Sequence, residues 1–167
     1  MLTKNDFSPA DWTTIRELPH LVGFATLLSG SSGLGTVKES MAIAQQILEG
    51  QSSDLGFIRD LSNRTETQAA QTSIREMLSG LGSELSSDRM KSLTLERVAN
   101  GLSVLGAKAS PDEVSQYRQW LYAIAEKVAK AAKEGGFLGF GGTQISEGEQ
   151  KFLNELQTAL QITTKNT

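Results

Sequence analysis

The chain has 167 residues, of which 38% are hydrophobic, and this is enough apolar material to bury a sizeable core as one domain. Its formal net charge of -3 arises from 16 basic and 19 acidic residues spread along the chain, a distribution that argues against nucleic acid or an anionic membrane as partners. The absence of cysteine excludes disulfides, thiolate metal sites and cysteine nucleophiles.

The first quarter of the chain is predicted to form two helices that meet at Pro19. Ser8 is a typical N-cap residue and Pro9 is favoured at the first helical position, so we expect a helix to begin at Pro9. We expect this short helix to end before Pro19, and a second helix to run from Pro19 to Leu28. Residues 18–37 contain no Asp, Glu, Lys or Arg, which predicts a buried helix with a glycine-rich exit and not a membrane span.

The middle of the chain is predicted to be helical from its caps and its apolar spacing. Thr36 to Glu39 has the spacing of a capping box, Asp54 to Leu61 indicates a short helix, and Thr65 to Gln68 has capping-box spacing again. The expected apolar faces of the two longer helices are Val37, Met41, Ala44 and Leu48, and then Ala70, Ile74, Met77 and Leu81. Gly50 ends the former helix, and Gly80 and Gly82 end the latter.

Three further helices are predicted in the second half. One begins near Ser87 and contains Gly101, where a mid-helix glycine favours close packing. Ser110 to Glu113, with Pro111 between them, begins a long helix that runs to about Glu134. Ser146 to Glu149 begins the last helix, and residues 163–167 are expected to fray.

The predicted fold is therefore an all-α, single-domain bundle over residues 1–167, with about seven or eight helices, three or four of them long. No alternating strand pattern bounded by hairpin turns is present. Residues 1–11 contain no basic region followed by an apolar run, so we expect no secretory signal and a cytoplasmic location.

Motifs for catalysis, metals or cofactors are not found. Gly30 to Thr36 has the glycines of a phosphate loop but lacks the lysine before the threonine. His20 is the only histidine, and no Glu-x-x-His motif or Gly-x-Ser-x-Gly elbow is present. We therefore expect a protein that is not an enzyme and that binds no metal and no cofactor.

The least ordinary stretch is the apolar loop at residues 135–142, which carries Phe137, Leu138 and Phe140 among five glycines. Interhelical loops are usually polar, so these side chains are predicted anchors for a protein partner or for a second copy of the chain. Alternatively, they fold back and cap the bundle. Two other functions remain open: a small-molecule pocket between helices near Trp120 and Tyr122, and an enzyme that uses carboxylates.

The same region carries a family resemblance. Residues 128–149 join an apolar helix to a loop and then to an Ile-Ser-x-x-Glu segment that starts at Ile145. This order resembles the tellurite-resistance TerB-like helical proteins. It is also similar to a small bacterial family of helical proteins with the signature Gly-Gly-Phe-Leu-Gly-Phe-Gly-Gly. Both resemblances imply an all-helical fold. The TerB-like turn carries metal-associated Asp residues that this loop lacks, so metal binding is not carried over.

Overall fold

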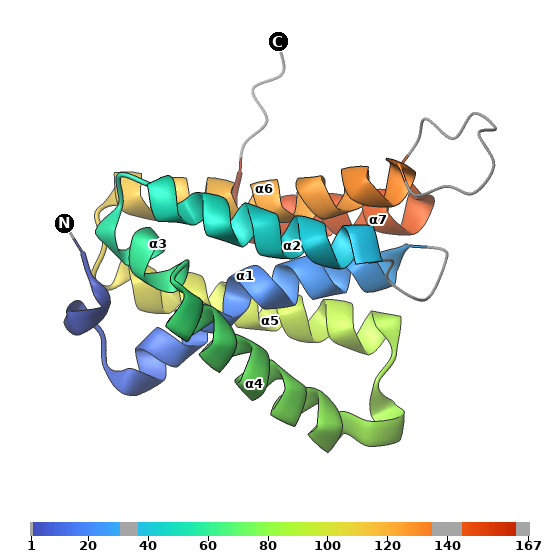
Figure 1. Cartoon of the computed structure of the whole chain (residues 1–167), viewed down its shortest axis with the longest axis horizontal. Coiled ribbons are helices and arrows are strands. Elements are labelled where there is room, and N and C mark those ends of the chain that lie inside the picture. The colour runs from blue at the N-terminus through green and yellow to red at the C-terminus, as the bar shows by residue number, and fades with distance from the viewer. Residues whose placement is uncertain (1, 31–36, 135–144, 163–167) are drawn as a thin grey trace, which may run out of the picture.

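The computed structural model describes residues 2–30, 37–134 and 145–162, and every regular element within them is a helix (Figure 1). The α-helices are α1 (Pro9–Ser29), α2 (Val37–Glu49), α3 (Gly56–Leu61), α4 (Arg64–Leu81), α5 (Ser87–Gly106), α6 (Pro111–Glu134) and α7 (Glu147–Ala159). Short 3-10 turns cover Lys4–Asp6, Gly50–Ser52 and Gly82–Glu84. Four helices, α1, α4, α5 and α6, have 18 to 24 residues. The predicted all-α bundle is confirmed.

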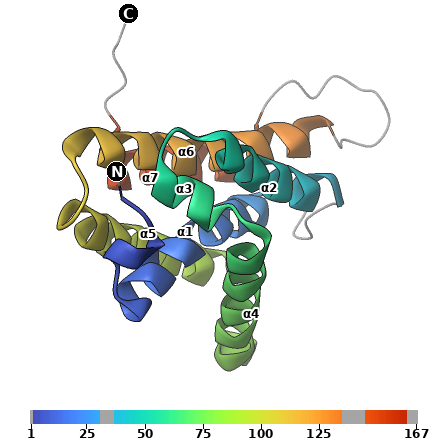
Figure 2. The same ribbon diagram turned by 60° about the vertical axis from the view of Figure 1, so that its left-hand side comes forward.

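Helix α1 is the centre of the bundle. It contacts α2, α4, α5, α6 and α7, with α2, α6 and α7 on one side of it and α4 and α5 on the other (Figures 1 and 2). Within α1, the uncharged run from Leu18 to Ser29 is buried except at Phe24 and Leu28, as its composition predicts. None of the helices in the described ranges is long and apolar enough to cross a membrane.

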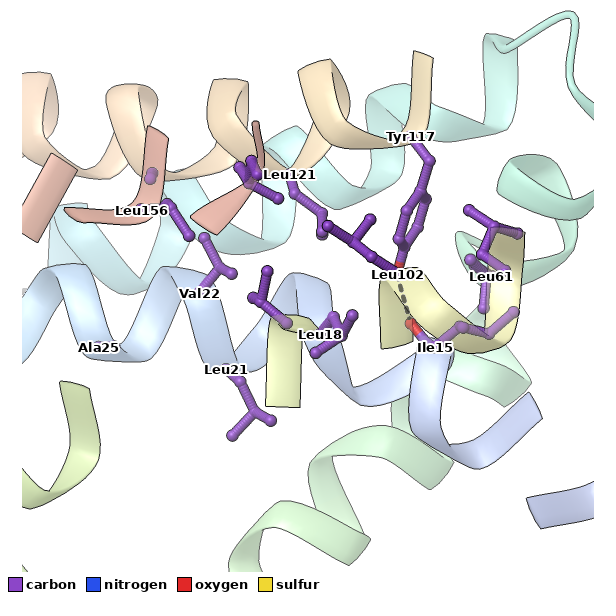
Figure 3. Packing of buried hydrophobic residues seen from close by; sticks show 14 of the residues in the cluster. Ile15, Leu18, Leu21, Val22, Ala25, Leu61, Leu102, Tyr117, Leu121 and Leu156 are labelled. Carbon is purple, nitrogen blue, oxygen red and sulfur yellow. Dashed lines mark hydrogen bonds between the residues drawn. The ribbon is translucent and has the colours of Figure 1, made fainter. Parts of the chain in front are cut away.

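The predicted helix boundary at Pro19 is wrong, because α1 continues through this residue. A proline inside a helix has no N–H to donate to the carbonyl four residues earlier, here that of Ile15. The hydroxyl of Tyr117 on α6 donates to this carbonyl instead, at 2.7 Å (Figure 3). The bend of α1 near its middle in Figure 1 is typical of an internal proline. A donor from a distant helix thus replaces the missing backbone N–H, and α1 continues through Pro19.

Most predicted helix starts are confirmed. Ser110 and Glu113 form a reciprocal capping box at the start of α6, and Ser146 and Glu149 form one at the start of α7. The predicted box at Thr65 to Gln68 is wrong, because α4 begins earlier and the side chain of Asn63 accepts from the backbone N–H of Glu66. Thr36 and residues 163–167, which carry two further predictions, lie outside the described residues.

The predicted buried face of α2 is also wrong. The helix buries Ala42 and Ile47, whereas Met41 and Leu48 are 65% and 50% exposed. Apolar residues lie on both faces of this helix, so periodicity alone selected the incorrect face. An apolar stripe that also includes the exposed Ala44 therefore faces solvent.

Close packing at Gly101 is confirmed. A Cβ atom at this position would lie 2.5 Å from Cδ1 of Leu18, so the glycine lets α5 approach α1. Because Leu18 lies in the middle of the core cluster, the contact fixes the position of α1 relative to α5.

Candidate ligand-binding pocket

A pocket of about 460 Å³ lies along α1 between α2 and α4. Small-molecule sites commonly measure about 300 to 1,000 Å³, are mostly apolar and contain a few polar groups that orient the ligand. The pocket matches this description in size and in lining. Its walls are Phe24, Ile43, Ala44, Ile74 and Leu78, and its polar groups are His20, Gln71 and Arg75.

Helical spacing brings these side chains together. His20 and Phe24 are four residues apart on α1, so they lie one above the other on the same face. Gln71, Ile74, Arg75 and Leu78 follow a spacing of three, four and seven residues on α4, which also places them on one face. Helix α4 crosses α1 at an angle (Figures 1 and 2). Ile43 and Ala44 of α2 form the third wall of the pocket.

His20 is the buried polar group of the pocket, at only 9% exposure. Burial lowers the pKa of its imidazole from 6.5 to about 4, because the charged form loses its hydration. The ring is therefore neutral at neutral pH and offers one N–H donor and one nitrogen acceptor. Among the described residues it has no hydrogen-bond partner, and its nitrogens are not among the fully buried atoms that lack one, so they reach the surface of the pocket.

Arg75 supplies the formal charge of the pocket. No hydrogen bond or ion pair joins its guanidinium to the part of the chain that the structure describes, and the same holds for the amide of Gln71. The buried carboxylate of Glu17, one turn before His20 on α1, is already compensated: it accepts from the hydroxyl of Ser73 and lies 3.5 Å from Arg97. Arg75 and Gln71 are both exposed, so they lie at the solvent rim of the pocket, where the charge of Arg75 is free of internal ion pairs.

A glycine and a buried carboxylate hold the walls in place. A Cβ atom at Gly23 would lie 2.8 Å from Cγ1 of Ile43, so this glycine lets α2 approach α1 beside the pocket. In the first turn of α4, Glu66 accepts hydrogen bonds from the indole N–H of Trp12 at 2.8 Å and from Arg16 at 3.2 Å. Lys4 completes the cluster, which fastens the start of α4 to α1.

Two other hollows are lined mostly by polar or already paired side chains, although the buried indole N–H of Trp120, which lines the first, has no partner among the described residues. Trp120 lines the first, a hollow of about 240 Å³ between α2 and α6 whose other residues are mostly polar. Tyr122 is not among its lining residues, because positions two apart on a helix point in different directions. The second hollow, of about 450 Å³, is lined by Lys4 and Arg16, whose charges already pair with Glu66.

The sequence-predicted anchors Phe137, Leu138 and Phe140 lie outside the described residues. Within the ranges that are described, no three His, Cys, Asp or Glu side chains gather as metal ligands. His20 has no carboxylate partner there that would orient it as a general base. The arrangement can bind a ligand, and it shows no pair of groups placed for proton transfer.

Sequence reasoning missed the pocket residues. The sequence shows His20 only as a lone histidine next to an expected helix boundary at Pro19, and the expected apolar face of the helix that begins near Thr65 does not include Leu78. A usable signal is the position of the only histidine inside an uncharged run, because a polar side chain in a mostly buried helix is often found at a pocket.

Comparison of the chain with protein-family models, with curated proteins and with solved structures gives no match. The pocket is therefore interpreted from its own chemistry.

Proposed function

We propose that this chain is a non-catalytic, cytoplasmic helical protein that binds a small molecule in the pocket between α1, α2 and α4. The observation that carries the proposal is a pocket with apolar walls that brings together His20 and, at its exposed rim, the polar side chains Gln71 and Arg75. The ring nitrogens of His20 are not among the fully buried polar atoms that lack a partner, so they reach the surface of the pocket, where a ligand can contact them. The cysteine-free composition supports the cytoplasmic location.

The test uses a neutral amphiphile, decanol, and a variant that fills the pocket. Ala44 lies at the exposed edge of the pocket, so Ala44→Trp blocks the site without disturbing the core. The matched control is Ala99→Trp, at an exposed alanine of α5 that does not line the pocket. We expect calorimetry to show saturable binding that Ala44→Trp weakens by about tenfold or more and Ala99→Trp leaves unchanged. Equal binding by both variants would exclude the pocket as the site.

Association with another protein, or with a second copy of the chain, is the second candidate function. The exposed stripe of Met41, Ala44 and Leu48 on α2 favours it, because exposed apolar patches commonly mark interaction surfaces. The loop residues Phe137, Leu138 and Phe140 are the further anchors that we propose for this interface.

Size-exclusion chromatography with light scattering tests this second function. We expect a dimer in the wild type, and a monomer with unchanged melting in two double variants, Met41→Ser/Leu48→Ser and Phe137→Ser/Phe140→Ser. A wild type that stays monomeric at high concentration would contradict self-association. A several-degree fall in the melting temperature of the loop variant would show instead that the loop caps the bundle.

A further inference from the structure

We infer that the ligand of the α1–α2–α4 pocket is a small amphipathic carboxylate, whose acid group pairs with Arg75 and whose apolar body lies between Phe24, Ile43 and Leu78. This inference rests on the proposed function and adds to it the charge and the shape of the ligand.

The charge of the pocket selects an anion. Arg75 is the charged residue among the eight that line it, and no acidic side chain is among them. Glu17, the nearby buried carboxylate on α1, is held by Ser73 and Arg97, so it does not compete for Arg75. A positive site on a chain with a net charge of -3 is a local exception to the overall charge. Electrostatic complementarity therefore favours an anionic ligand over a neutral or a cationic one.

The polar groups match a carboxylate head. The planar guanidinium of Arg75 carries donors in a fork that fits the two carboxylate oxygens. Gln71 lies four residues before Arg75 on the same face of α4 and offers an amide N–H₂. Across the pocket, the neutral imidazole of His20 can donate one further hydrogen bond from its buried position on α1. Donors from two helices thus line the same pocket.

The remaining walls match an apolar body. Phe24 comes from α1, Ile43 and Ala44 come from α2, and Ile74 and Leu78 come from α4. None of them offers a side-chain hydrogen bond to a ligand. A polar anion such as a sugar phosphate would leave its hydroxyl groups unpaired against these walls. An alkyl or aryl acid buries its apolar surface there, and this difference sets the ligand class.

The test compares three amphiphiles of equal chain length by calorimetry: decanoate, decanol and decylammonium. We expect decanoate to bind about tenfold more tightly than decanol, because a charge-assisted hydrogen bond is added to the same apolar contacts. Decylammonium should bind most weakly. The variant Arg75→Gln should lower the ratio of decanoate to decanol affinity from about tenfold to about one, because glutamine retains the helix and loses the charge. The control Arg89→Gln, at an exposed position of α5, should keep the preference.

The outcomes separate the two proposals. If decanol and decanoate bind equally, or if Arg75→Gln leaves their ratio unchanged, the carboxylate inference is wrong and small-molecule binding stands. Tightest binding by decylammonium would also overturn the inference. If none of the three compounds binds, the proposed function and the inference fail together. Circular dichroism of each variant confirms that the fold is intact before binding is compared.

Discussion

The buried His20 makes the stability of this protein depend on pH in a range where few other groups titrate. Burial lowers the pKa of its imidazole in the folded chain to about 4, from 6.5 when it is solvated. Between these values the unfolded chain binds a proton that the folded chain does not, so acid favours unfolding. The contribution of the neutral ring is fully present above about pH 6.5 and is lost as the pH falls towards about 4. Linkage gives a loss of about 2 kcal/mol by about pH 5 and about 3 kcal/mol by about pH 4.

Urea unfolding at about pH 7.5 and about pH 5 measures this loss. His20→Gln is the control variant, and its free energy of unfolding should change far less over the same interval. Buried Glu66 does not obscure the result: burial would raise the pKa of its carboxyl, but hydrogen bonds from Lys4, Trp12 and Arg16 outweigh burial and lower it. The stabilisation from ionised Glu66 is therefore lost only as the pH falls below the pKa of a free glutamate carboxyl, which lies below this interval.

Proton NMR gives the same pKa without a variant, because the chain has a single histidine. We expect the imidazole resonances of His20 to stay in their neutral position down to about pH 5. A titration midpoint near 6.5 would refute the reasoning, because it would show that water in the pocket solvates the ring and that burial does not penalise its charge.

Two further changes test the packing around α1. Tyr117→Phe removes the donor to the Ile15 carbonyl and should destabilise the fold by about 1 to 3 kcal/mol, whereas Tyr122→Phe, at a half-buried tyrosine with no such bond, should be nearly neutral in thermal melts. Gly101→Ala forces the new methyl group against Leu18 and should cost about 1 to 3 kcal/mol in urea unfolding. Gly106→Ala, near the end of the same helix with open space around it, should be neutral or slightly stabilising, and equal effects of the two alanines would contradict the close contact.

The helices and many of their ends could be predicted from the sequence because their causes are local. The capping pairs at Ser110 and Ser146 join residues three positions apart, so the sequence carries their geometry directly. Pro19 behaves differently. Its helix continues because a hydroxyl from Tyr117, far along the chain, replaces the missing donor. Such a contact depends on the packing of α1 against α6, and no local pattern encodes it.

The pocket could not be predicted for a related reason. Its walls come from three helices. In α2, the apolar face that periodicity predicts to be buried is exposed, and the opposite face is buried. Neither Arg75 nor His20 belongs to a sequence motif that predicts a binding site. They become a candidate site only when the angle between α1 and α4 places both beside the same apolar surface.

Methyl-resolved NMR during a titration with decanoate tests the central claim most directly. We expect saturable shifts of the methyl resonances of Ile43, Ile74 and Leu78, with little change at Ile58 beside the Trp120 hollow. Shifts centred on Ile58, or no saturable shift at any methyl group, would contradict a ligand site between α1, α2 and α4.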